Sequence, residues 1–229
     1  MKISFKQFKQ DIQDVVPYSE IKQWGAIHPY FVPIYGKLVY FKRLKQSLSL
    51  IKRYTRGPKT IADIGCGFGT LVKLMQEEYP HAKITGLDLR SKKHLTYASK
   101  ICKGKSKFIQ GNVENLPFKA NSFDVIVITD VLEHVSKPFQ ALDELKRTLR
   151  EDGLLLILVP TESILLKLMR AILYYGKLQS DYHWTHAINN VNQFELEVLK
   201  RFKIIKRTNA PFGIGGNLLN YDAVYVCRK

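Results

Sequence analysis

Hydrophobic residues from position 60 onward form short runs that alternate with amphipathic segments of helical period. The run 154–159 is apolar throughout, as expected for a central strand that is covered on both faces. This alternation predicts βαβ units and a parallel sheet. The expected strands are 60–65, 83–88, 106–110, 123–128 and 153–159, and the expected helices lie near 69–79, 91–102 and 138–150.

The C-terminal part continues this pattern less regularly. Residues 193–199 have the spacing of a helix, and segments 202–206 and 221–226 have the composition of two last strands. Segment 163–175 carries an apolar stripe that is wider than one sheet-facing side needs. We interpret this segment as a buried helix, or alternatively as a lid or interfacial helix that admits an apolar substrate.

Residues 1–57 predict helical segments interrupted by prolines, so we expect an N-terminal helical extension over 1–57 and a larger domain over 58–229. No acidic residue occurs between Glu20 and Asp63. Aromatic residues and nine basic residues fill this interval, which favours contact with an anionic lipid surface or with RNA. The alternative is an amphipathic helix that exposes its lysines to water. The basic residues are Lys22, Lys37, Lys42, Arg43, Lys45, Lys52, Arg53, Arg56 and Lys59.

The composition of the 229 residues is that of a globular protein, with 45% hydrophobic and 24% charged residues, and the length suits one α/β domain. The net charge of +16 indicates an anionic partner, or alternatively simple solubility. The three cysteines lack metal-binding or redox spacing, which favours free thiols in a reducing cytosol. Without a signal-peptide core or a long apolar run, we expect a cytoplasmic protein with at most peripheral membrane contact.

The strand expected at 60–65 leads into a glycine-rich turn with the spacing G-x-G-x-G, formed by Gly65, Gly67 and Gly69. Glycines let the backbone turn tightly and approach a ligand more closely than a Cβ would allow. The spacing differs from the G-x-G-x-x-G of nicotinamide sites, which argues against that cofactor. Asp63 precedes the turn, and Asp88 ends the next strand, where a carboxylate can accept both hydroxyls of a ribose.

This order of motifs resembles the class I S-adenosylmethionine (SAM)-dependent methyltransferases, in particular the subgroup that acts on quinones, lipids and other small molecules. The resemblance covers residues 58–160 well and the first fifty residues hardly at all. It implies an α/β fold with a Rossmann-like, doubly wound seven-stranded sheet, mostly parallel with a C-terminal antiparallel hairpin. It also implies methyl transfer from SAM to an oxygen or carbon atom of a small-molecule or lipid-like acceptor.

The resemblance assigns cofactor contacts to particular residues. Asp63 and the glycine turn would hold the methionyl end of SAM, and Asp88 would hold the ribose. Asn112 stands where many relatives carry aspartate beside the adenine, and its carbonyl can still accept from the N6 amino group. The Val113 amide would serve a ring nitrogen, and Leu89 would pack on the base. The implied cofactor-binding residues are Asp63, Gly65, Cys66, Gly67, Gly69, Asp88, Leu89, Asn112, Val113 and Thr129.

Asp130, Glu133 and His134 follow the fourth strand and resemble the Glu-x-x-Glu-His set of certain metal-dependent methyltransferases. On a helical turn the three side chains share one side, where they could face one divalent cation. Aspartate at the first position departs from that set, and Leu-Glu-His is common in relatives with no known metal. We therefore expect no metal, and these three residues are the ligands if one binds.

The candidate catalytic residues are His186, His183 and Asp130. A histidine near position 183–186 could act as general base for a hydroxyl acceptor, because its ordinary pKa is near neutrality. The alternative is a surface loop anchored by Trp184. Two other functions stay open: an RNA methyltransferase, although the N-P-P-Y motif is missing after the fourth strand, and a SAM-binding module without catalysis.

Overall fold

The computed structural model describes residues 4–23, 40–160, 191–210 and 222–229. Within these ranges the strands form one seven-stranded sheet in the order β3-β2-β1-β4-β5-β7-β6. Strands β1 to β5 pair in parallel, and β7 runs antiparallel to both of its neighbours. The strands are β1 (Thr60–Ile64), β2 (Lys83–Asp88), β3 (Lys107–Gln110), β4 (Phe123–Thr129), β5 (Leu149–Pro160), β6 (Lys203–Ala210) and β7 (Asp222–Arg228).

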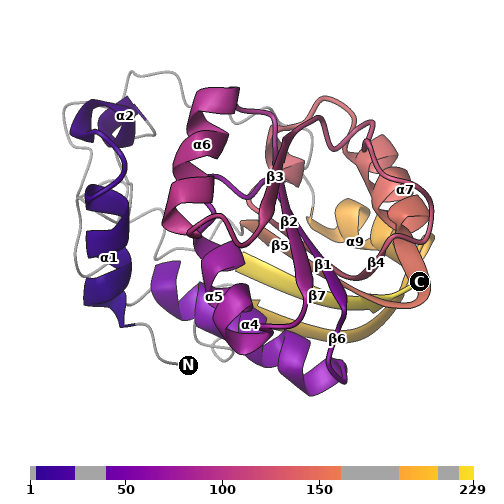
Figure 1. Ribbon diagram of the computed structural model, residues 1–229. Helices are drawn as coiled ribbons and strands as arrows, with labels where there is room; N and C mark the ends of the chain where they lie inside the picture. Colours follow the sequence, from indigo (N-terminus) through magenta and orange to yellow (C-terminus); the bar gives the residue numbers. More distant parts are fainter. Residues whose placement is uncertain (1–3, 24–39, 161–190, 211–221) are drawn as a thin grey trace.

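Helices cover both faces of the sheet (Figure 1), which makes the fold doubly wound. One hydrophobic cluster joins the sheet to α4, α5 and α6, and a second joins the opposite face to α7 and α9. The helices are α1 (Phe5–Gln13), α2 (Tyr18–Gln23), α4 (Lys42–Tyr54), α5 (Thr70–Glu78), α6 (Lys92–Ile101), α7 (Pro138–Thr148) and α9 (Val191–Leu199), with a short 3-10 turn η2 (Leu132–His134).

The predicted fold class and the positions of its strands are confirmed. The two main differences are at β6, which continues to Ala210 rather than ending at residue 206, and at β5. Strand β5 begins at Leu149 rather than at residue 153 because Leu149 already pairs with Phe123 of β4 before a bulge. Helix α7 ends at Thr148 as a consequence, two residues earlier than expected. The predicted apolar segment 163–175 lies outside the described residues.

The N-terminal helices share their core with the rest of the domain. Ile12 and Val16 are almost fully buried in the same cluster as α5 and α6. An ion pair joins Asp11 to Lys73 of α5, and Lys93 Nζ of α6 lies 2.5 Å from Glu20 Oε1. The described part of this extension therefore packs directly on helices that cover the sheet. The domain boundary expected at residue 57 stays a prediction.

Candidate active site

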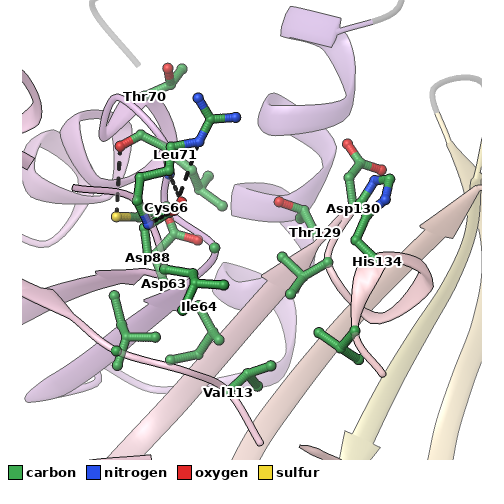
Figure 2. A pocket seen from close by; sticks show the side chains of 18 of the residues that line it. Asp63, Ile64, Cys66, Thr70, Leu71, Asp88, Val113, Thr129, Asp130 and His134 are labelled. Atoms are coloured by element: carbon green, nitrogen blue, oxygen red, sulfur yellow. Dashed lines mark hydrogen bonds and ion pairs between the residues drawn. The ribbon is translucent and has the colours of Figure 1, made fainter. Parts of the chain in front are cut away.

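A pocket of about 390 Å³ opens where the chain order of the sheet reverses, between the carboxyl ends of β1 and β4. Ligands of open α/β sheets bind at this switch point, because the loops after the two strands diverge there. Eleven of the residues predicted from the sequence line the pocket: Asp63, Gly65, Cys66, Gly67, Asp88, Leu89, Asn112, Val113, Thr129, Asp130 and His134. Figure 2 shows Asp63, Cys66 and Asp88 at one end and Asp130 and His134 at the other.

The three turn glycines all have positive φ angles, 79° at Gly65, 52° at Gly67 and 74° at Gly69, which other residues rarely adopt. A Cβ on Gly65 would lie 2.0 Å from Cγ2 of Val131, so the turn after β4 packs directly on the glycine turn. Gly69 does not line the pocket. A Cβ there would lie 3.0 Å from the Phe108 ring of β3 and 3.2 Å from Cβ of Ala98 in α6, so its glycine serves the packing of this helix start against α6 and β3.

Backbone hydrogen bonds hold the glycine turn against the end of β2. The amides of Gly65 and Cys66 both donate to the carbonyl of Leu87, at 2.7 and 3.0 Å. The Gly67 amide donates to Asp88 Oδ2 at 2.8 Å, and the Arg90 amide donates to Asp88 Oδ1 at 2.9 Å. Each carboxylate oxygen has two lone pairs, so Asp88 can still accept a ligand hydroxyl on each.

Asp63 is a buried carboxyl beside the turn, with 2% of its surface exposed. Its Oδ1 has no hydrogen-bond partner among the described residues. Burial, and next the negative charge of Asp88, raise the pKa of Asp63 to about 7. A buried oxygen without a donor is costly unless a ligand supplies one, and an ammonium group would supply both the donor and the opposite charge. The α-ammonium of a methionyl moiety fits this requirement.

The part of the pocket formed by residues after β2 and β3 carries apolar side chains that suit a planar base. Leu89 is 69% exposed although it is a large hydrophobic residue, and Val113 is buried below the same region. Asn112 lines this part, but its Oδ1 already accepts from the Glu114 amide at 2.9 Å. Its carbonyl therefore offers only its remaining lone pair to an adenine, which is less than the sequence interpretation assumed.

The other end of the pocket is formed by the turn after β4 and the start of α4. Asp130 has a φ of 54°, and its Oδ2 accepts from Arg43 Nη2 at 2.6 Å. Burial raises the pKa of Tyr40 to about 12, and burial lowers the pKa of His134. Both side chains therefore line the pocket as neutral groups near pH 7. Tyr40 and Arg43 were missed by the sequence analysis, where they were counted only within the basic, aromatic segment.

Asp130, Glu133 and His134, the residues named as ligands in case a metal binds, are not arranged as a metal site. Among the described residues, no group of three His, Cys, Asp or Glu side chains is placed to hold an ion. Asp130 pairs with Arg43 instead, and Glu133 is buried while 45% of the His134 side chain is exposed. The two predicted catalytic histidines, His183 and His186, lie outside the described residues.

A second, strongly basic groove of about 540 Å³ lies at the amino ends of the parallel strands, whereas the first pocket lies at their carboxyl ends. Arg150 pairs there with Asp124, but in the described part of the chain the side chains of Arg56 and Lys59 have no ion pair. The basic residues that line the groove are Arg53, Arg56, Lys59, Arg150 and Arg228. No helix within the described ranges is long and apolar enough to cross a membrane.

Comparison with known families shows that residues 62–157 match the family described as a methyltransferase domain. Residues 62–157 are a methyltransferase domain. The resemblance to class I SAM-dependent methyltransferases is thereby confirmed over this range, which contains every cofactor-binding residue predicted above. The nicotinamide alternative is excluded by the same match.

Curated relatives of this methyltransferase domain carry related names. A malonyl-[acyl-carrier protein] O-methyltransferase of Paenibacillus sp. is 33% identical over 66% of this chain and 58% of its own length. A demethylmenaquinone methyltransferase of Thermotoga maritima is 38% identical over 44% of this chain and 43% of its own length. The chain therefore spans about half the length of the curated relatives it matches.

Solved structures share the fold of the methyltransferase domain at low sequence identity. The plantazolicin methyltransferase BpumL, solved in complex with SAH, has a TM-score of 0.68 at 18% identity and covers 98% of this chain and 97% of its own. A SAM-dependent methyltransferase from Aquifex aeolicus has a TM-score of 0.63 at 15% identity, with 91% and 96% covered. At these identities the likeness shows the fold alone.

Proposed function

We propose that the protein is a SAM-dependent methyltransferase that acts on a small-molecule or lipid-like acceptor. One observation carries this proposal: the unpartnered Asp63 oxygen, the glycine turn and Asp88 converge in one pocket at the switch point of the sheet. The names of the relatives, which include carrier-protein and quinone methyltransferases, support an acceptor of this class.

Three groups of this chain would hold SAM. Asp63 accepts from its ammonium group, the carboxylate of Asp88 accepts from the ribose, and Leu89 with Val113 encloses the base. When bound, SAM supplies an activated methyl group. The protein then contributes mainly positioning, because it must hold the acceptor atom in line with that group at near-attack distance and exclude water.

The first test separates cofactor binding from catalysis. Calorimetry of the full chain should detect SAM binding, and incubation with SAM labelled in its methyl group should transfer label to a quinol or lipid fraction. Binding without transfer to any fraction would favour the alternative of a SAM-binding module. Label in an RNA fraction alone would favour the RNA methyltransferase.

We also propose that the basic groove makes peripheral contact with an anionic lipid surface. Its support is the set of exposed cations at Arg53, Arg56, Lys59 and Arg150, which face away from the pocket end of the sheet.

A further inference from the structure

A buried arginine joins three parts of the chain at the end of the pocket that is formed by the turn after β4 and the start of α4. Arg43 of α4 is 3% exposed. Its Nη2 lies 2.6 Å from Asp130 Oδ2 at the end of β4, and its Nε lies 2.5 Å from Oδ2 of Asp222, which is fully buried on β7. Removing one partner of such a group leaves buried charge with less compensation, which is costly.

Asp130 is the carboxylate of this group that reaches the ligand space, beside Arg43. Its side chain is 32% exposed and lines the pocket, whereas Asp222 does not. Its backbone adopts a left-handed conformation with φ of 54°, which is uncommon for residues other than glycine and is tolerated best by Asp and Asn. The chain thus accepts local strain to place a carboxylate at this point.

The Asp130 carboxylate has unused capacity to accept a hydrogen bond. Arg43 holds Oδ2, while Oδ1 has no hydrogen-bond partner in the described part of the chain. The terminal torsion of aspartate is broad, so a small rotation presents this oxygen to the pocket. A buried acceptor that lacks a donor is explained most simply by a donor on the substrate.

We propose that Asp130 accepts the proton of a hydroxyl-bearing acceptor of phenol or enol type, and that Arg43 is the positioning residue that orients its carboxylate. This inference rests on the proposed function. It adds the chemical class of the acceptor: a neutral group with an acidic O–H proton rather than a carboxylic acid, which is already ionised at neutral pH and has no proton to give.

The transfer step balances with these groups alone. The acceptor oxygen bonds to the methyl carbon as the bond from that carbon to sulfur breaks, and the hydroxyl proton passes to Asp130. The positive charge of the sulfonium and the negative charge of the carboxylate disappear together. For transfer to carbon, the hydroxyl proton passes to Asp130 first, and the ring carbon of the resulting phenolate bonds to the methyl carbon as the bond from that carbon to sulfur breaks. The C–H proton of that ring carbon then moves to the oxygen, which restores the aromatic ring.

The test uses the full chain with SAM labelled in its methyl group and three acceptors at pH 8. 1-Naphthol is largely unionised, 4-nitrophenol is largely ionised, and dodecanoate is a carboxylate. We expect transfer to the phenols and none to dodecanoate. Asp130→Asn should lower kcat on 1-naphthol about 10²- to 10⁴-fold, as for loss of a general base, and less than tenfold on 4-nitrophenol, which needs no base.

Variants separate positioning from loss of fold. Asn tolerates the left-handed backbone at position 130, and Asp222 still pairs with Arg43 in this variant, so it should fold. Arg43→Lys keeps the charge but loses the two-armed contact, and should lower kcat on 1-naphthol more than on 4-nitrophenol with the Kd of SAM within threefold of wild type. Asp143→Asn changes an exposed carboxylate that does not line the pocket and should leave all rates unchanged.

Several results would overturn the inference while leaving the proposed function intact. One is SAM binding with transfer to dodecanoate only or to no phenol. Another is an equal loss of kcat on both phenols in Asp130→Asn. A third is a loss of kcat on 1-naphthol alone in His134→Gln rather than in Asp130→Asn. Absence of SAM binding in the wild-type chain would instead overturn the proposed function itself.

Discussion

The amide of Gly67 donates a 2.8 Å hydrogen bond to Oδ2 of Asp88, so the glycine turn and the end of the second strand hold each other in place. Asp88 therefore has two tasks, since it supports the turn and offers its remaining lone pairs to the ribose. We expect Asp88→Ala to weaken SAM binding by 100-fold or more, because each charge-assisted bond lost costs about 1.5–3 kcal/mol.

Calorimetry with SAM checks this expectation, and circular dichroism checks that the domain is folded. Asp124→Ala is a matched control. Asp124 also accepts from two backbone amides, those of Lys59 and Thr60 at 2.8 Å, but it lies at the amino end of its strand. Its loss should reduce stability without changing the Kd of SAM. Wild-type affinity in Asp88→Ala would remove the cofactor assignment.

Gly65→Ala tests the close packing of the two turns. The new Cβ would lie 2.0 Å from Val131 Cγ2, and the φ of 79° is strained for alanine. Overpacking of about 1–3 kcal/mol adds to about 1–2 kcal/mol for the left-handed backbone, so the free energy of unfolding should fall by roughly 2–5 kcal/mol. Gly57→Ala has a φ of 64° but no atom within 4 Å, and should show the backbone cost alone. Urea denaturation distinguishes them, and equal losses would contradict the packing argument.

Much of this site is predictable from the sequence because its parts are local. A strand, a G-x-G-x-G turn and an acid at the end of the next strand follow one another within one βαβ step, so residues such as Asp63 and Asp88 can be found by spacing. The strand positions follow for the same reason, since each is a short hydrophobic run in a regular alternation.

Arg43 could not be found in that way. Its partners, Asp130 and Asp222, lie 87 and 179 residues further along the chain, and only the folded sheet brings them to α4. The sequence pattern placed this arginine among the surface cations, yet it is 3% exposed. Gly69 illustrates the converse limit, because the motif could not distinguish a glycine needed for a ligand from one needed for helix packing.

Asp63 makes SAM binding depend on pH. Its pKa is about 7 in the unliganded protein, and a bound ammonium group favours the ionised carboxyl, so the pKa is lower in the complex. Binding must then weaken as pH falls through 7. Between pH 7.5 and 5.5 we expect an increase of about 20-fold in the Kd, while the ligand's own amino group stays largely protonated. Asp63→Asn should bind weakly with a Kd that no longer varies with pH.

The stability of the unliganded protein should change with pH in the opposite direction to SAM binding. The folded-state pKa of about 7 lies above the ordinary value of 3.8, so the folded state binds more protons than the unfolded state between these values. This carboxyl therefore contributes stability at low pH that is lost as pH rises towards 7. The melting temperature of wild type, compared with that of Asp63→Asn, should therefore fall as pH rises across this range. A difference in melting temperature that stays constant with pH would exclude the raised pKa.

The basic groove at the amino ends of the strands should bind anionic lipid. Arg56 and Lys59 are exposed, and each basic residue near an acidic bilayer contributes about 1 kcal/mol, which salt screens. The double variant Arg56→Glu, Lys59→Glu should therefore lose co-sedimentation with vesicles that contain phosphatidylserine. The control Lys92→Glu, Lys137→Glu makes the same change in charge on two exposed residues that follow the carboxyl ends of β2 and β4, and should sediment as wild type.

Competition decides between the two anionic partners, because either could use the same cations. If lipid is the partner, wild-type protein should sediment with anionic but not with neutral vesicles. RNA added as a competitor at moderate concentration should not displace the protein from the anionic vesicles. Negligible sedimentation with both vesicle types, together with tight RNA binding that the groove variant loses, would defeat the lipid proposal and support RNA. Equal behaviour of the groove and control variants would assign the binding to overall charge, since a net charge of +16 attracts polyanions without a defined site.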